Sequence, residues 1–284
     1  MIGTRITVAV CIVGLLGACG SSSKPKPKPK PKANATTTTL AASVSRVDVW
    51  GDSLTVQSRD ALRVEGRAHG LAVTVNAYVG LAPCDLAPFV RGSLARPPGA
   101  VVLAFTGNNI TPCMQRAGKP LTGAPYYAEY ASVVGQLVAA ATARRIPVIV
   151  VGPPTFPPSE NHPDRVALNV LYRWLVAAHP GARYVALGPA LSPHGFSRTV
   201  ACLAGETAAL GCRSGVITVR SGNGIHLDEP RPVACPDGSG GCMYSAGGHR
   251  YADAILAALA TIASLSYRSA DPTVGVPIAA NQGG

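Results

Sequence analysis

Short apolar runs alternate with longer helical patterns over most of the chain, and this alternation constrains the fold more than any other feature. Strand-like runs occupy 47–50, 71–79, 99–107, 146–154 and 182–188, and helical patterns occupy 53–70, 126–145, 163–181 and 247–265. Such alternation gives a parallel sheet with helices on both faces. With 47% hydrophobic residues, the chain can fill one core. We therefore predict a single α/β domain: three α/β/α layers around a mostly parallel five-stranded sheet, without a second domain or internal repeat.

The net charge of +11 raises the question of nucleic-acid binding. Seven of these charges, however, lie on Arg5, Arg46 and the five lysines between residues 24 and 32, before the first acidic residue, Asp48. The remaining +4 is a mild surface charge, so we exclude a nucleic-acid partner.

The first residues have the pattern of an export signal. Arg5 precedes an apolar run at 6–16 that is too short to span a bilayer. The run ends in "LGAC", which resembles the lipobox of bacterial lipoproteins, in which the cysteine (here Cys19) is lipidated. A plain cleaved signal with a stray cysteine is the alternative. We expect a signal peptide at 1–18 and a lipoprotein on the outer face of the cell membrane, or else a secreted protein.

The segment after Cys19 alternates lysine with proline and is typical of a spacer. Proline breaks helices and sheets, and like charges keep the chain extended, at about 3 Å per residue. We predict a lipidated linker at 19–46, a folded domain at 47–266 and a flexible tail at 267–284.

Six cysteines lie in the predicted domain, and in an exported chain they favour disulfides over metal binding. No pair has CxxC spacing and none adjoins a histidine. Six cysteines allow 15 pairings. They are Cys84, Cys113, Cys202, Cys212, Cys235 and Cys242.

Ser53 lies where the first strand ends and a helix begins, in "GDSL". Free backbone N–H groups surround such a position. Alone, Ser53 would read as an ordinary helix cap. The tetrapeptide after the first strand, however, resembles the first block of the GDSL, or SGNH, hydrolase family.

The other blocks of that family have counterparts here, in order and at strand ends. Gly80 follows the second strand, and "GNN" follows the third, where Asn109 matches by spacing and Asn108 is the fallback. Ile110 replaces the usual aspartate. Among six histidines, His226 in "RSGNGIHL" has the family context, with Asn223 in place of the acid. The resemblance covers residues 47–265.

The resemblance implies a flavodoxin-like SGNH hydrolase fold and a serine esterase or deacylase. Ser53 would be the nucleophile, His226 its base, and the N–H groups of Ser53 and Gly80 with the Asn109 amide the oxyanion hole. Carbohydrate, lipid or small acyl esters are the implied substrates. Acyl transfer to an envelope glycan is an alternative, and a non-catalytic binding lipoprotein is another. No metal or organic cofactor is implied, and the oligomeric state stays open.

Asn223 departs from the pattern, because an amide can orient the histidine but supplies no negative charge. We expect a Ser53–His226 dyad in which the Asn223 oxygen accepts the ring N–H. Asp228 is the next candidate for the acid, and Asp52 is a weaker one that we expect to fix the loop. Deamidation of the Asn223-Gly224 pair is a third route to an acid.

The positions of the cysteines relative to these blocks suggest their pairing. Cys84 lies four residues after Gly80, and Cys113 four after Asn109. We predict a Cys84–Cys113 bridge between the loops with the oxyanion donors. Cys202–Cys212 and Cys235–Cys242 would then close local loops near the mouth of the site.

Overall fold

A computed structural model describes residues 44–160, 163–204, 206–235 and 240–263. All described residues belong to one compact unit. The predicted signal peptide, Cys19, the linker up to residue 43 and the predicted tail lie outside the described residues. No helix within the described ranges is both long and apolar enough to cross a bilayer.

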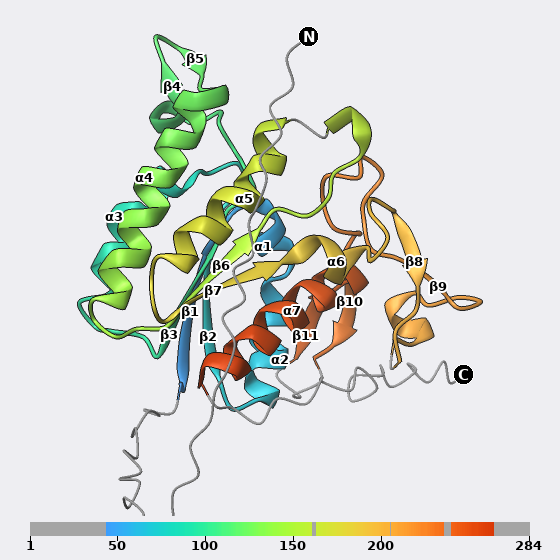
Figure 1. The fold of residues 1–284 in the computed structure, drawn as a ribbon. Coiled ribbons are helices and arrows are strands. Elements are labelled where there is room, and N and C mark those ends of the chain that lie inside the picture. Colours follow the sequence, from blue (N-terminus) through green and yellow to red (C-terminus); the bar gives the residue numbers. More distant parts are fainter. Residues whose placement is uncertain (1–43, 161–162, 205, 236–239, 264–284) are drawn as a thin grey trace, which may run out of the picture. The chain divides into compact units, whose positions relative to one another are not determined.

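A five-stranded sheet in which all strands are parallel forms the centre of the domain (Figure 1). In spatial order its strands are β2 (Ala72–Ala77), β1 (Arg46–Gly51), β3 (Ala100–Ala104), β6 (Val148–Gly152) and β7 (Ala182–Ala186). The five predicted strands are confirmed. The chain runs from β1 to β2 on one side and then to β3 on the other, so a crevice is expected where β1 and β3 end.

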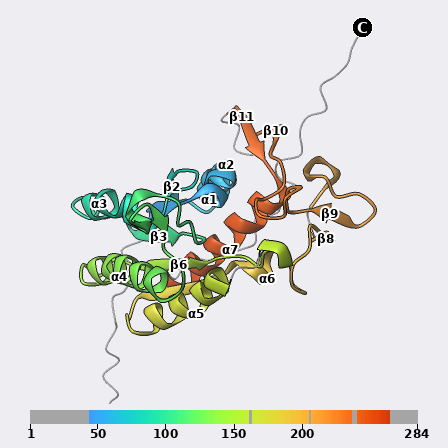
Figure 2. The ribbon, with the colours of Figure 1, turned by 90° about the horizontal axis from the view of Figure 1, so that it is seen from above.

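Helices cover both faces of the sheet, as Figures 1 and 2 show. One face packs against α1 (Ser53–Gln57), α2 (Arg59–Ala68), α6 (Leu187–Leu191) and α7 (Ala246–Ala263). The other packs against α3 (Pro83–Ser93), α4 (Gly123–Thr142) and α5 (Pro163–Ala177). The predicted three-layer α/β/α class is therefore confirmed.

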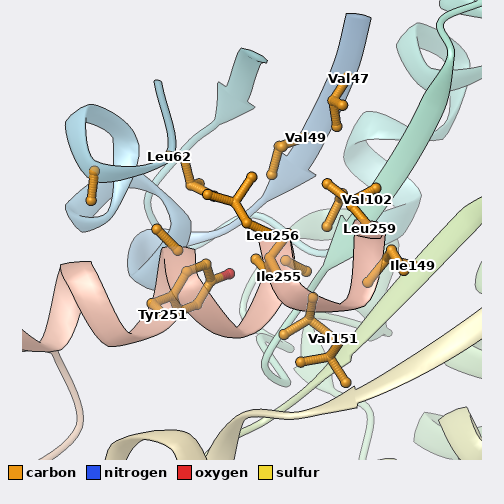
Figure 3. Close-up of a cluster of buried hydrophobic side chains, with 14 of the residues drawn as sticks. Val47, Val49, Leu62, Val102, Ile149, Val151, Tyr251, Ile255, Leu256 and Leu259 are labelled. Carbon is orange, nitrogen blue, oxygen red and sulfur yellow. The ribbon is translucent and has the colours of Figure 1, made fainter. Parts of the chain in front are cut away.

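Successive side chains of the central strands point to opposite faces of the sheet, so the core has two parts, one on each face. On β3, Val102 belongs to the cluster under α7, whereas Val101 and Leu103 belong to the cluster under α3 and α4. Figure 3 shows the α7 side, where Tyr251, Ile255, Leu256 and Leu259 lie against strand valines and Ile149. Strands buried on both faces explain why these runs are almost continuously apolar in sequence.

The helix predicted at 53–70 is two helices, and its predicted cap is wrong. Asp52 is the cap of α1 and accepts from the Leu54 N–H, so that Ser53 is the first residue inside the helix. The break falls at Ser58, whose hydroxyl donates to the Leu54 carbonyl at 2.9 Å. A serine bonded to the preceding turn bends a helix, and here it separates α1 from α2.

The helix α3 was not predicted. Pro83 at its first turn and Asp85, whose carboxylate accepts from the Ala82 N–H at 2.8 Å, are ordinary start signals. Pro88 inside the helix obscures the helical pattern in the sequence. This helix matters to the site because it begins just after Gly80.

In the described part of the chain, three small hairpins and three short 3₁₀ helices lie outside the central sheet. The hairpins are β4 (Gln115–Arg116) with β5 (Lys119–Pro120), β8 (Thr199–Ala201) with β9 (Val216–Thr218), and β10 (Arg231–Ala234) with β11 (Gly241–Tyr244). The 3₁₀ helices are Pro112–Met114, Pro158–Glu160 and Ala208–Leu210. The last two hairpins flank the segment that carries His226.

Candidate active site

Ser53 lies at the tight corner between β1 and α1. Its side chain is half-buried, and its hydroxyl has no hydrogen-bond partner among the described residues. The corner requires Gly51, because a Cβ there would lie 2.7 Å from the Ala104 carbonyl oxygen and 2.1 Å from the Thr55 hydroxyl. The hydroxyl is thus available to another group at the carboxyl end of the sheet.

Asp52 joins this corner to the loop after β3. Its carboxylate is fully buried and accepts from the Thr106 N–H and hydroxyl, both at 2.6 Å. The Asn108 amide donates to the same oxygen at 3.4 Å. Burial raises the pKa of Asp52. This carboxyl faces the β3 loop and, as expected, fixes it.

The predicted oxyanion donors lie in the loops after β2 and β3. Asn109 donates one amide hydrogen to the Leu121 carbonyl at 3.0 Å, which leaves it a second one. Asn108 donates to Asp52 and also to the Leu81 carbonyl at 3.1 Å, so its amide is used within the fold. Gly80 lies under Ile110, since a Cβ on Gly80 would be 3.6 Å from the Ile110 Cδ1. The two loops are therefore neighbours.

The loop that carries His226 is attached to α1. The Leu227 N–H donates to Gln57 Oε1 at 3.1 Å. Gln57 lies one turn after Ser53 on the same face of α1, and helical side chains lean back toward the N-terminus. The attachment therefore places the histidine loop along the face of the helix that begins with Ser53.

A second attachment reaches the loop after β6. Arg220 donates to the Thr155 carbonyl at 2.9 Å. Gly224, at φ 70°, lies against this loop and against the segment between α6 and β8: a Cβ on it would be 3.1 Å from Pro157 and 2.7 Å from the Phe196 ring. The tight approach explains why a glycine stands directly after Asn223.

Asn223 contacts His226, but not in the predicted way. Its side-chain oxygen accepts from the Ile225 N–H at 2.9 Å, the His226 N–H at 3.3 Å and the Ser221 hydroxyl at 2.6 Å. Backbone N–H groups can only donate, so this oxygen cannot be exchanged with the amide nitrogen. The nitrogen therefore faces His226 Nδ1, at 3.2 Å.

This contact has a consequence for the histidine. The amide nitrogen donates to Nδ1, so the proton of the neutral ring lies on Nε2. The expectation that the Asn223 oxygen accepts the ring N–H is wrong, because the turn of the loop already uses that oxygen. Burial and then the charge of Arg220 lower the pKa of His226, so the ring is neutral at neutral pH.

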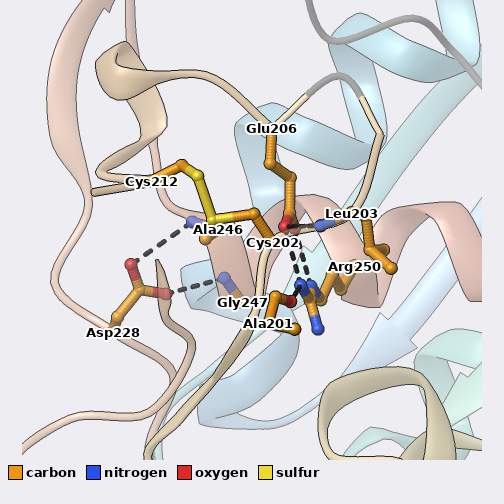
Figure 4. Close-up of polar contacts among 9 residues, drawn as sticks. All are labelled: Ala201, Cys202, Leu203, Glu206, Cys212, Asp228, Ala246, Gly247 and Arg250. Atoms are coloured by element: carbon orange, nitrogen blue, oxygen red, sulfur yellow. Dashed lines mark hydrogen bonds and ion pairs between the residues drawn. A yellow bond between two sulfur atoms is a disulfide. The ribbon is translucent and has the colours of Figure 1, made fainter. Parts of the chain in front are cut away.

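Asp228 lies apart from the histidine in this network. Its carboxylate accepts from the Gly247 N–H at 2.7 Å and the Ala246 N–H at 3.3 Å, at the start of α7 (Figure 4). No carboxylate bonds to His226 within 44–160, 163–204, 206–235 and 240–263. Asp228 is therefore a helix cap here, and Asn223 is the side chain that meets the ring.

The structure contains the three predicted disulfides, Cys84–Cys113, Cys202–Cys212 and Cys235–Cys242. The first joins the start of α3 to the loop after Asn109, as predicted. Cys84, Asp85 and Cys113 also form the one potential metal-binding group among the described residues. The two cysteines are bonded to each other, so this group is a disulfide bridge with a carboxylate beside it.

A buried ion pair holds the Cys202–Cys212 loop on α7 (Figure 4). Arg250 of α7 is 3% exposed and bonds Glu206 through two nitrogens at 2.6 Å, and also the Ala201 carbonyl at 2.8 Å. Glu206 in turn accepts from the Leu203 N–H. Both partners of the pair thus have further hydrogen bonds, which fix the loop beside the histidine segment.

Four residues with structural roles at the site were missed in the sequence. Gln57 attaches the histidine loop, and Thr155 accepts from Arg220. Ser221 donates to Asn223, and Thr106 donates to Asp52. Thr106 could have been found, because it lies at the end of a predicted strand, directly before "GNN". Gln57 and Thr155 contact residues about 65 to 170 positions away, and no local pattern signals such contacts.

A family model described as "Protein of unknown function (DUF459)" matches residues 46–229. The chain belongs to this family. DUF459 is linked to the SGNH hydrolases, in agreement with the order of the Ser53, Gly80, Asn109 and His226 blocks. The match ends before β10, so the β10–β11 hairpin and α7 lie beyond it. A search of curated proteins gives no match.

Several solved structures resemble the chain. An alpha/beta hydrolase from the metagenome of Lake Arreo, Spain, has 18% identity and a TM-score of 0.48, over 77% of this chain and 96% of the other. The C-terminal catalytic domain of Streptococcus pneumoniae peptidoglycan O-acetyltransferase A has 15% identity and a TM-score of 0.46, over 78% of this chain and 96% of the other. A GDSL-like lipase from Bacteroides thetaiotaomicron has 14% identity and a TM-score of 0.46, over 76% of this chain and 88% of the other.

Proposed function

We propose that this protein is an exported serine esterase or deacylase of SGNH type. The observation that carries the proposal is the attachment of the His226 loop to α1 through Gln57, one turn from the unpartnered hydroxyl of Ser53. This attachment supports the proposal because it connects the segment of the proposed base with the helix of the proposed nucleophile, some 170 residues apart in the chain. The substrates would be acyl esters of carbohydrates, lipids or small alcohols.

The reaction would follow from the roles of these groups. Ser53 Oγ attacks the ester carbonyl and gives its proton to His226, and the alcohol leaves with that proton. The N–H groups of Ser53 and Gly80 and the free hydrogen of the Asn109 amide would hold the oxyanion. Water then attacks the acyl-serine, releases the acid and restores Ser53.

Exposed apolar side chains near Gly80 suit the acyl group. Tyr78, Val79 and Ile110 are 56%, 71% and 65% exposed. Tyr78 and Val79 directly precede Gly80, and Ile110 lies over it. An acyl chain whose carbonyl oxygen occupies the oxyanion hole would extend over these residues.

The position of the histidine proton would make this enzyme slow. A base must accept the Ser53 proton on a nitrogen with a lone pair, whereas Nε2 carries the proton when Asn223 donates to Nδ1. Reaction would require the other tautomer, which loses the hydrogen bond with Asn223. The same observation favours the second candidate, a binding lipoprotein that keeps the fold without catalysis.

A fluorophosphonate probe on the exported domain tests the proposal. An activated Ser53 reacts covalently, so labelling should occur in the wild type, strengthen in Asn223→Asp and vanish in Ser53→Ala and His226→Ala. With esters of different acyl lengths, the rate of hydrolysis should rank the variants in the same order as labelling does. Absence of labelling and hydrolysis in both the wild type and Asn223→Asp would instead support the binding lipoprotein.

We also propose that the protein is anchored at the outer face of the cell membrane through a lipid on Cys19. The lipobox-like sequence and the Lys-Pro spacer support this location.

A further inference from the structure

A groove of about 810 Å³ lies on the histidine side of the candidate site. It is lined by β9, β10 and the segment between them, by Gln57 of α1 and by Arg198, directly before β8. We call it the arginine groove and define it by the residues that the argument uses, namely Arg198, Arg220, Arg231, Asn223 and His226. Its volume is in the range of small-molecule sites.

The groove contains more positive than negative side chains. Arg198 and Arg231 are exposed at its rim and have no ion pair with any side chain that the structure describes. Asp228 also lines the groove, but its carboxylate already bonds two N–H groups at the start of α7. Glu229 is the remaining acid, so three arginines face one uncommitted carboxylate.

Arg220 is a buried cation that forms no ion pair with any of the described residues. It is 1% exposed, its Nη2 donates to the Thr155 carbonyl, and its guanidinium lies 5.7 Å from the centre of the Phe156 ring. Its Nη1 has no hydrogen-bond partner in the described part of the chain. Burial lowers the pKa of Arg220 to about 10, so it stays charged at neutral pH. An uncompensated buried charge is unfavourable, and a nearby anion would offset it.

The position of the groove indicates which part of a substrate it receives. In acyl transfer by a serine and a histidine, the histidine returns its proton to the leaving alcohol. The alcohol portion of the ester therefore lies beside His226, whereas the acyl portion lies toward Gly80. The groove contains His226 and Asn223 and is thus on the alcohol side.

We propose that the arginine groove binds an anionic group, a carboxylate or a phosphate, on the alcohol portion of the ester substrate. This inference rests on the proposed function for its orientation, but the anion site itself can be tested without catalysis. Arginine suits both groups because its planar fork bonds two oxygens at once. The substrate would accordingly be an acyl ester of an acidic sugar or of a phosphate-bearing alcohol.

Binding to the full mature protein carrying Ser53→Ala tests the inference. Glucuronate, glucose 6-phosphate and glucose are titrated while the His226 ring signals are followed by NMR. The two anionic sugars should bind, and glucose should bind much more weakly. The stronger of the two anions identifies carboxylate or phosphate as the natural group. Equal binding of all three sugars would overturn the inference.

Charge variants make the test specific. Arg198→Gln with Arg231→Gln should weaken binding of the anions by about tenfold per arginine, which is about 1.4 kcal/mol for each, because each arginine would form charge-assisted hydrogen bonds with the anion. The control with equal net charge is Arg63→Gln with Arg144→Gln, two exposed arginines outside the groove. Arg198→Lys with Arg231→Lys should restore part of the affinity. Unchanged binding in the glutamine pair would contradict the assignment.

The outcome is separable from that of the proposed function. If anions bind in Ser53→Ala but the fluorophosphonate never labels the wild type, the groove stands and the esterase fails. If Ser53 labels but the anionic sugars bind like glucose, the esterase stands and the groove assignment fails. In the active protein, the glutamine pair should raise KM for an anionic ester far more than KM for a neutral ester.

Discussion

At the scale of single residues, an amide in the place of a carboxylate decides the protonation of the histidine. The Asn223 oxygen is held by two backbone N–H groups, and its nitrogen meets His226 Nδ1 at 3.2 Å. An aspartate at this position would present an oxygen to the ring on either side. It would accept the Nδ1 proton and leave Nε2 free to act as a base.

Asn223→Asp should therefore raise kcat/KM for ester hydrolysis by at least about tenfold, and by up to about 10⁴-fold if the full effect of a triad acid is recovered. The measurement is steady-state kinetics on purified wild type and variant. Asn223→Ala is the control that removes the donor without adding charge. An Asn223→Asp protein no faster than Asn223→Ala would show that the tautomer does not limit the rate.

The same variant should change the pH dependence. Burial and Arg220 lower the pKa of His226, so wild-type kcat/KM should rise with pH through a pKa below the ordinary 6.5 and be constant at neutral pH. A carboxylate beside the ring stabilises its protonated form, so the limb should move to higher pH in Asn223→Asp. A rise in kcat/KM that moves to lower pH in Asn223→Asp would contradict the contact between residue 223 and the His226 ring.

Asp228 gives the opposite test, since it is a cap and not a triad member. Asp228→Ala leaves two N–H groups at the start of α7 without their acceptor. It should lower the free energy of unfolding by about 1–3 kcal/mol while ester hydrolysis survives. His226→Ala should do the reverse, abolishing hydrolysis with little effect on stability. Loss of activity in a folded Asp228→Ala protein would make Asp228 the missing acid.

At the scale of elements, the Cys84–Cys113 bridge connects the two loops with the candidate oxyanion donors. Cys84 belongs to the first turn of α3, after Gly80, and Cys113 lies in the 3₁₀ turn after Asn109. These loops end different strands, β2 and β3, that are not neighbours in the sheet. The bridge therefore fixes a distance that the sheet does not set directly.

Replacing both cysteines with serine should reduce kcat more than it alters KM. A donor misplaced by about 1 Å can cost 100-fold in rate, and the lost bridge should lower the free energy of unfolding by about 3 kcal/mol. Cys235→Ser with Cys242→Ser is the control, because that bridge closes the β10–β11 hairpin away from these loops. Equal loss of kcat in both pairs, measured where both are folded, would contradict a role in donor geometry.

At the scale of the whole molecule, the strand order places the site. β1 lies between β2 and β3, so Ser53, Gly80 and Asn109 follow three adjacent strand ends. His226 comes from a distant segment that α1 and the loop after β6 hold in position. The proposed catalytic groups thus all belong to the folded domain, and the residues before it are expected to set only its location.

Cys19→Ala should release the protein from membranes and leave its ester hydrolysis unchanged. The proposed anchor is a lipid on Cys19, and the Lys-Pro linker separates it from the domain. Membrane and soluble fractions are compared by immunoblot after a high-salt wash, with Cys11→Ala as the control cysteine in the predicted signal. A Cys19→Ala protein that still sediments with membranes would exclude this anchor.

The sequence by itself determined the class of the fold, the five central strands, the candidate nucleophile and histidine, and the three disulfides. These depend on local patterns: apolar runs buried on both faces of a sheet, a glycine-acid-serine corner, and cysteines close to loop motifs. Patterns of this kind are readable because neighbouring residues in the chain carry them. The sequence did not predict α3, since Pro88 interrupts the helical pattern that Pro83 and Asp85 begin.

Tertiary structure alone decided how the polar groups pair. The Asn223 side chain could turn either atom toward His226, and the N–H groups of the loop chose the nitrogen. Asp228 could have served the histidine, but the start of α7 takes its carboxylate. Arg220 is buried, without an ion pair to any described residue, because the loop after β6 and the histidine segment meet at it. Hydrogen bonds between distant segments depend on packing, and packing fixes which donor meets which acceptor.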